Sequence, residues 1–305
     1  MANITTTSVD DGLATIIAAE ALGYLKSNTV LARLVARDWD SEVASYGQSI
    51  KIPVRGALSA NDKSANSVVT LQAPTDTSYT VALTKHKEVS FLIEDIARFL
   101  ARPDYLSGYI QDSMAVLAEQ IDGDIAALYS GLSQTIDASA GLAESHFRQA
   151  RKLLNTARAP QQGRVAVLHE DAEYELLGIE RVVNRDYAET LGKAASEAMV
   201  GRFMGFDVFM DQNIKTSTTQ KNLFMHRNAL VLATRPLASA PAGMGVVQRV
   251  ADEDSMGLRV TLSYNPDHLG VQATIDVLYG VAELRDNHGG VVSTADLSYP
   301  RGGGP

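Results

Sequence analysis

The strongest pattern in the sequence is one long amphipathic stretch, residues 103–132. Its apolar residues recur every three or four positions, at Leu106, Ile110, Met114, Leu117, Ile121, Ile125, Leu128 and Leu132. This spacing keeps them on one stripe of a helix, and Asp112, Glu119 and Asp122 fall on the opposite side. At about 1.5 Å per residue the helix would be a rod roughly 40 Å long, well beyond the usual globular helix. A helix of this length suits an assembly protein better than an enzyme.

The segment before this helix predicts a projecting β-hairpin. Residues 49–55 form a short strand pattern, and Pro53 restricts it to an edge. Residues 56–78 are small and polar, with several turn formers. Apolar residues then alternate with polar ones, first at Tyr79, Val81 and Leu83 and again at Val89, Phe91 and Ile93. We expect a long hairpin that leaves the body and returns, with Lys85 and Lys87 on an exposed limb; a floppy surface loop is the alternative.

The remaining elements are shorter. Helical patterns cover residues 10–26, 30–37, 142–158 and 170–178, and residues 131–141 are a linker rich in small residues. Strand-like runs cover residues 164–169, 201–210, 223–234, 258–264 and 271–285. The last residues are rich in Gly and Pro and predict no regular structure.

Composition limits the function. The chain of 305 residues is 45% hydrophobic and has no apolar run near the roughly 20 residues that cross a bilayer. No cysteine is present, so disulfides and thiolate metal sites are excluded, and the first residues do not resemble a signal peptide. We therefore expect cytoplasmic synthesis and no membrane association. The net charge of −9 argues against a protein that grips nucleic acid broadly.

A search for catalytic chemistry is negative. The six histidines share no metal-binding spacing, and His169-Glu170 lacks the second histidine of a zinc-protease helix. Gly192-Lys193 lacks the preceding glycine of a phosphate loop, and no Gly-x-Ser-x-Gly elbow occurs. The acids at 252–254 lack the spacing of a calcium loop. We predict no enzyme activity and no catalytic, cofactor-binding or metal site.

The order of these parts resembles one family, the major capsid proteins of tailed double-stranded DNA bacteriophages, which have the Hong Kong 97 fold. Four strings also resemble this family: FLIEDIARFLARPD before the long helix, GRFMGFDVFMDQNI, LFMHRNALVLATRPL and IDVLYGVAEL. The resemblance covers nearly the whole chain, but the strings are degenerate and its weight lies in their order.

The resemblance implies an α+β fold with an N-terminal arm, an extended hairpin called the E-loop, a peripheral domain built on a long spine helix, and an α/β axial domain. The arm would be residues 1–52, the E-loop 53–83 and the peripheral domain 84–137, with the spine helix at 103–132. The axial domain would be residues 138–250, and residues 255–305 would return to the peripheral domain. A hinge is expected at the base of the E-loop and near residues 131–141.

The implied function is assembly into hexamers and pentamers that form an icosahedral shell around DNA. Implied partners are further copies of the chain, a separate scaffolding protein, a portal protein, a decoration protein and packaged double-stranded DNA contacted non-specifically. Candidate residues for contacts between subunits are Trp39, Arg55, Asn61, Asp62, Lys63, Lys85 and Lys87. Three alternatives stay open: an encapsulin-type nanocompartment shell with protein cargo, a soluble α/β enzyme with an unrecognised pocket, and a tail or surface structural protein.

Overall fold

A computed structural model describes most of the chain. The described residues are 6–37, 49–54, 58–94, 105–179, 199–214, 219–239, 246–253 and 256–295. The helices are α1 (Thr6–Asn28), α2 (Leu31–Leu34), α4 (Tyr105–Ala126), α5 (Glu144–Thr156), α6 (Glu170–Leu177) and the 3-10 helices η2 (Ala127–Gly131) and η5 (Asp286–His288). The strands are β1 (Ser49–Val54), β2 (Thr77–Ala82), β3 (Lys85–Glu94), β4 (Thr135–Ala138), β5 (Arg164–Leu168), β6 (Met199–Phe203), β7 (Phe206–Met210), β8 (Thr219–His226), β9 (Leu230–Thr234), β10 (Val246–Glu253), β11 (Met256–Asn265), β12 (Gly270–Glu283) and β13 (Gly289–Ala295).

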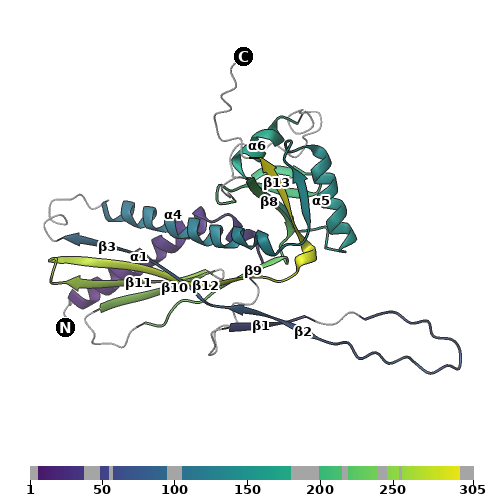
Figure 1. Cartoon of the computed structure of the whole chain (residues 1–305). Coiled ribbons are helices and arrows are strands. Elements are labelled where there is room, and N and C mark those ends of the chain that lie inside the picture. Colours follow the sequence, from purple (N-terminus) through teal and green to yellow (C-terminus); the bar gives the residue numbers. More distant parts are fainter. Residues whose placement is uncertain are drawn as a thin grey trace, which may run out of the picture.

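Helix α4 confirms a long helix within the predicted residues 103–132. It has 22 residues and continues as the 3-10 helix η2 to Gly131. The predicted stripe is its buried face, with Ile110, Met114, Ile121 and Ile125 all at most 1% exposed. The helix runs along the body of the molecule above the strands β3 and β12 (Figure 1). Helix α1, which confirms the helix predicted at residues 10–26, packs beside α4 through its own buried face.

The predicted position of Asp122 is wrong. Asp122 was expected on the solvent side of the long helix, but it is only 1% exposed. Its two carboxylate oxygens accept hydrogen bonds from the backbone N–H groups of Val30 and Ala32. The segment from α1 to α2 therefore covers a second flank of α4, which periodicity within α4 alone does not reveal.

One sheet lies under α4 and α1. Its strand order is β10-β11-β12-β3, and β9 pairs with β12 beyond the end of β3. Every pairing in it is antiparallel. Alternate residues of β11 and β12, such as Leu258, Val260, Ile275 and Val277, point into the core beneath the helices. This placement confirms the predicted strands at residues 258–264 and 271–285.

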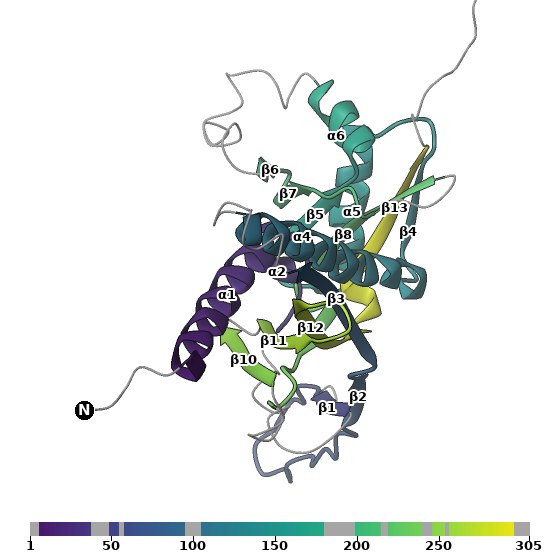
Figure 2. The same ribbon diagram turned by 90° about the vertical axis from the view of Figure 1, so that its left-hand side faces the viewer.

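A second, mixed sheet forms the other lobe, with the order β4-β13-β8-β5-β7-β6. Pairs β13–β4 and β5–β7 are parallel, and the other pairs are antiparallel. Helices α5 and α6 cover one face, where Phe147 of α5 packs edge-on against Phe224 of β8 at a ring separation of 4.9 Å. The opposite face, with Val165, Leu223 and Val291, joins the same hydrophobic core as α4. The two lobes therefore share a core. Figures 1 and 2 show how the two lobes are arranged.

Three segments cross between the lobes side by side: residues 132–134, 227–229 and 284–288. The backbone N–H of Leu284 donates to the carbonyl of Ala229 at 2.8 Å. Ser133 donates to Asp286 from its backbone N–H at 2.6 Å and also from its hydroxyl. A Cβ atom at residue 289 would lie 2.9 Å from the end of the Leu132 side chain, so Gly289 lets the two segments pack closely.

Sheet membership differs from the predicted division at three places. The predicted linker at residues 131–141 contains β4, which joins the six-stranded sheet. Strand β13 also lies in that sheet, although residues 255–305 were expected to return to the peripheral part. Strands β9 and β10, expected in the axial part, lie in the five-stranded sheet. Short strands beside glycines carry weak patterns, and pairing partners are not encoded locally.

The predicted hairpin is partly confirmed. Strands β1 and β2 pair antiparallel from Ser49↔Ala82 to Val54↔Thr77. Beyond them residues 58–76 contain no strand and form an extended projection away from the body (Figure 1). The second alternating run was wrongly placed in the hairpin, because Val89, Phe91 and Ile93 lie in β3 and pair with β12.

Candidate functional site

The projection formed by residues 58–76 is the most unusual surface of the molecule. Every residue in it is exposed, including four large apolar side chains: Leu58 at 72%, Val68 at 90%, Val69 at 63% and Leu71 at 90%. These apolar side chains stay in contact with water and bury little surface against their own chain. Exposed apolar surface of this kind is typical of a site that another molecule covers.

The two limbs of the projection are held together by one side chain instead of a strand ladder. The side-chain oxygen of Gln72 accepts the backbone N–H of Ser59 at 2.9 Å, and its amide nitrogen donates to the Ser59 carbonyl at 2.5 Å. At the tip, the N–H of Ser67 donates to the carbonyl of Ser64 at 3.2 Å, and Asn66 takes a left-handed conformation with φ of 64°. The projection is thus extended but has a defined turn.

The structure places the predicted contact residues in different parts of the molecule. Asn61, Asp62 and Lys63 lie together near the tip and are exposed, and the Lys63 ammonium donates to the Ser64 carbonyl at 3.0 Å. Trp39 and Arg55 lie outside the described residues. Lys85 and Lys87 were expected on a projecting limb, which is wrong, because both lie in β3 and pair across to β12.

Lys85 anchors the sheet to the spine helix. Its ammonium lies 2.8 Å from the Asp124 carboxylate of α4, which also accepts the Tyr279 hydroxyl at 2.6 Å. Burial would raise the pKa of Asp124, but the hydrogen bonds from Lys85 and Tyr279 outweigh it and hold that pKa below its usual range. Burial and the Asp124 carboxylate raise the pKa of Tyr279. Strand β3, which follows β2 along the chain, is therefore fixed to α4.

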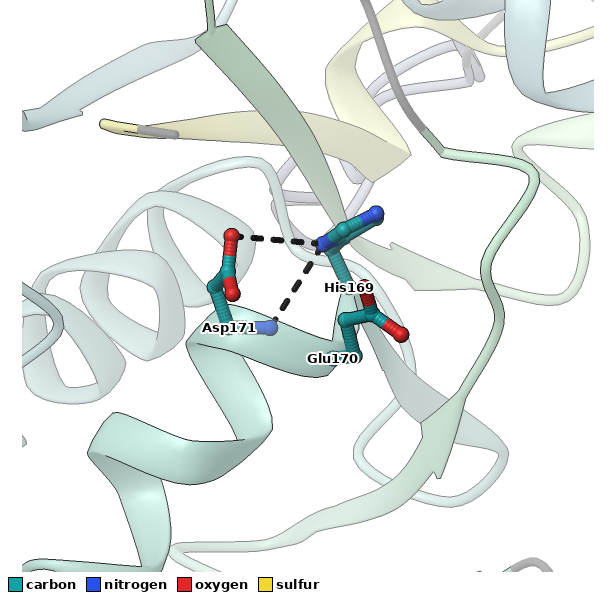
Figure 3. A group of neighbouring side chains, drawn as sticks. All are labelled: His169, Glu170 and Asp171. Atoms are coloured by element: carbon teal, nitrogen blue, oxygen red, sulfur yellow. Dashed lines mark hydrogen bonds and ion pairs between the residues drawn. The ribbon is translucent and has the colours of Figure 1, made fainter. Parts of the chain in front are cut away.

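One group of metal-type ligands comes together within the described part of the chain: His169, Glu170 and Asp171 (Figure 3). His169 is 2% exposed and precedes α6. Its Nδ1 accepts the backbone N–H of Asp171 at 3.5 Å and lies 3.9 Å from the Asp171 carboxylate. The Glu170 side chain is exposed, and its carboxylate accepts a hydrogen bond from the side-chain amide of Gln212 at 3.1 Å. His169 thus acts as the N-cap of α6, a structural role in which Nδ1 accepts the Asp171 N–H.

Other buried polar side chains also serve the fold. Asn222 in β8 accepts the backbone N–H of His169 at 2.8 Å and donates to the Thr294 hydroxyl at 2.9 Å. Gln220 accepts from that same hydroxyl at 3.0 Å and donates to Asp171. The chain of hydrogen bonds ties β13 through β8 to α6.

No helix among the described residues is long and apolar enough to span a membrane.

Sequence reasoning missed two features. The buried Asp122 sits among the polar residues of an amphipathic helix, and nothing local distinguishes it from Asp112 or Glu119, which are exposed. The surfaces of α5 and α6 were also missed, although their charge pattern is visible in the sequence: α5 carries Arg148, Arg151 and Lys152, whereas α6 begins with consecutive acids.

No family model and no curated protein matches the sequence. Among solved structures, the chain is similar to one from Mycobacterium phage Che8, with a TM-score of 0.64 and 19% identity over 87% of this chain and 90% of that chain. It is also similar to the capsid structure of the cyanophage P-SCSP1u, with a TM-score of 0.59 and 15% identity over 83% and 85% of the two chains. The acidic stable capsid of the Helicobacter pylori bacteriophage KHP30 matches with a TM-score of 0.57 and 11% identity over 82% of this chain and 84% of that chain.

These structures come from different phages and match at low identity over most of the chain, so the likeness concerns the whole architecture. The chain therefore has the Hong Kong 97-type fold of bacteriophage capsid proteins.

Proposed function

We propose that this chain is a major capsid protein of a tailed bacteriophage. Its copies would form hexamers and pentamers and then an icosahedral shell that packages double-stranded DNA. One observation carries the proposal beyond the fold: residues 58–76 project from the body with exposed Val68 and Leu71, each 90% exposed. Such a segment suits a protein whose neighbours cover it.

The projection can act as a clamp between copies. Burying two exposed apolar side chains on a neighbour removes apolar surface from water, and each contact contributes on the order of 1.5–3 kcal/mol if burial is complete. Each copy would give one projection and receive one, so weak contacts add up through high effective concentration. Strand β1 pairs only with β2 among the described strands, so its outer edge could also pair with a strand of another copy.

In this proposal the lobe built on the five-stranded sheet is the peripheral domain and the lobe built on the six-stranded sheet is the axial domain. The role is structural instead of catalytic, and the shell would form in the host cytoplasm and end in the virion. A separate scaffolding protein, a portal protein, a decoration protein and non-specifically contacted DNA are the further partners of this proposal.

The test is electron microscopy of the purified full chain, expressed with and without a candidate scaffolding protein, together with sedimentation velocity. Closed shells or polyheads are expected. Replacing residues 58–76 by a short Gly-Ser link should leave the melting temperature of the unassembled chain unchanged and abolish shells. Val68→Ser with Leu71→Ser should raise the concentration needed for assembly at least about tenfold. Thr70→Ser, a polar exchange in the same segment, is the matched control.

Three results would contradict the proposal or a part of it. Normal shells from the chain that lacks residues 58–76 would show that assembly does not need the projection. A monomer or dimer under every condition would favour an enzyme or binding protein. Shells that enclose a co-purified protein and no genome would instead support an encapsulin-type compartment.

A further inference from the structure

Helix α5 presents a basic face to solvent. Phe147, Ala150 and Leu154 are buried against the six-stranded sheet. Arg148, Arg151 and Lys152 are exposed, and their spacing of three and four residues places them on one side of the helix. We call these three residues the basic stripe. Because the whole chain has a net charge of −9, this cluster does not follow from composition.

The basic stripe is held in place but is not neutralised. Arg151 donates to the carbonyl of Met204, in the turn between β6 and β7, at 3.1 Å. Within the described residues, neither Arg148 nor Lys152 has a carboxylate partner. Two cations therefore lie on the surface without an ion-pair partner among the described residues.

Helix α6 presents the opposite character on the same lobe. Ala172 and Leu176 face the sheet, while Glu170, Glu173, Tyr174 and Leu177 lie on the outer side with the spacing of one helical face. We call these four residues the acidic stripe. Tyr174 is 75% and Leu177 48% exposed, so apolar surface accompanies the two acids. Burial raises the pKa of the Glu173 carboxyl.

Both helices cover the face of the six-stranded sheet that lies away from α4 (Figures 1 and 2). One lobe thus carries two helical faces of opposite charge, and the side chains of both stripes are at least partly exposed. Opposite patches on different faces of one molecule fit a head-to-tail contact between copies, which closes into a ring when the rotation is right.

We propose that the acidic stripe of one copy docks on the basic stripe of the next copy in a ring. In such a contact the carboxylates of Glu170 and Glu173 would meet Arg148 and Lys152. The Tyr174 ring and Leu177 would pack along the aliphatic stems of those basic side chains. This inference rests on the proposed function and names the contact that would hold a capsomer together around its axis.

DNA phosphate is the other partner that the basic stripe alone could take. It would leave Tyr174 and Leu177 uncovered and would make no use of the acidic stripe. The observations therefore favour a second copy of the chain.

The test is charge reversal with rescue in the full chain. The first variant combines Arg148→Glu and Lys152→Glu, and the second combines Glu170→Lys and Glu173→Lys. Each places like charges against each other, so each should raise the concentration needed for rings or shells at least about tenfold. The variant with all four changes restores opposite charges and should assemble close to the unmodified chain. Arg33→Glu, an exposed reversal on α2, is the control that should assemble normally.

Assembly is read by sedimentation velocity and electron microscopy, and circular dichroism shows that each variant is folded. Normal assembly of both two-site variants overturns the inference and leaves the proposed function intact. Folded variants that assemble poorly and are not rescued by the four-site combination also overturn it. Normal shells from the first variant with a reduced DNA content would assign the basic stripe to DNA instead. If the unmodified chain itself forms no assembly, the proposed function fails and the inference falls with it.

Discussion

The carboxylate of Asp122 accepts the backbone N–H of Val30 at 2.6 Å, and its second oxygen accepts the N–H of Ala32 at 2.9 Å. Asp122 lies in the spine helix α4, whereas Val30 and Ala32 lie at the start of α2. The contact therefore caps α2 and fastens the N-terminal helices to the spine. Asp211, at the end of β7 in the other lobe, adds a repulsive charge that also raises the pKa of Asp122.

Asp122 predicts an unusual pH dependence of stability. Burial raises its pKa from 3.8 to about 7, although the N–H donors favour the charged form. Between these values the folded chain holds a proton that the unfolded chain has released. The contribution of this group to the free energy of unfolding is therefore fully present below pH 3.8 and is lost as pH rises through about 7, a change of at most about 4 kcal/mol.

Asp122→Asn removes this titration. The melting temperature of the unmodified chain minus that of the variant should fall as the pH rises from about 5 to about 8, measured on the unassembled chain. Asp112→Asn changes an exposed acid on the same helix and should leave the pH profile unchanged. A constant difference between Asp122→Asn and the unmodified chain would show that Asp122 does not titrate in this range.

The sequence predicted α4, α1 and the long strands β11 and β12 because their patterns are long and local. Asp122 could not be placed, since its partners Val30 and Ala32 lie 92 and 90 positions away. Alternation likewise showed that Val89, Phe91 and Ile93 form a strand, but not that this strand pairs with β12 instead of β2. Of the candidate contact residues, Asn61, Asp62 and Lys63 are exposed on the projection and their contact role stays a prediction. Lys85 was misplaced because a lysine inside a strand can pair with a helix above the sheet.

The anchor between Lys85 and Asp124 predicts a coupled loss of stability. Asp124→Ala leaves both Lys85 and the Tyr279 hydroxyl without this partner and should lower the free energy of unfolding by about 2 kcal/mol. Lys85→Met should have a smaller effect, about 1 kcal/mol or less, because the Lys85 side chain is 35% exposed and solvent screens its charge. Urea unfolding of the two single variants and of the double variant measures the coupling. Strictly additive effects would mean that the pair contributes nothing.

His169 predicts a capping role and no metal dependence. His169→Ala removes the acceptor for the Asp171 N–H and should lower stability by about 1 kcal/mol, whereas His169→Asn, a better capping residue, should restore part of it. Zinc or a chelator should leave the melting temperature of the unmodified chain unchanged. If zinc instead raises the melting temperature of the unmodified chain, and this rise disappears in both His169→Ala and Asp171→Asn, a metal site at this group would be established.

The junction between the lobes predicts a loss of stability in acid. His226 at the end of β8 and His288 before β13 are buried, and their rings meet edge to face at 6.0 Å. Burial lowers the pKa of both rings, and the charges of Arg164 and Arg285 lower them further.

Because the folded pKa of each ring lies below its unfolded value of 6.5, the stability from these groups is present above pH 6.5 and is lost as pH falls. Protonation of His226 at Nδ1 would also break a hydrogen bond, because Nδ1 accepts the backbone N–H of Asn228 at 3.2 Å. His288→Gln should therefore reduce the fall in melting temperature between pH 7 and about 5, relative to the unmodified chain. His268→Gln, outside the junction, is the control. Equal acid sensitivity in all three proteins would show that the loss arises elsewhere, whereas a selective effect would place an acid-sensitive contact where the three crossing segments join the lobes.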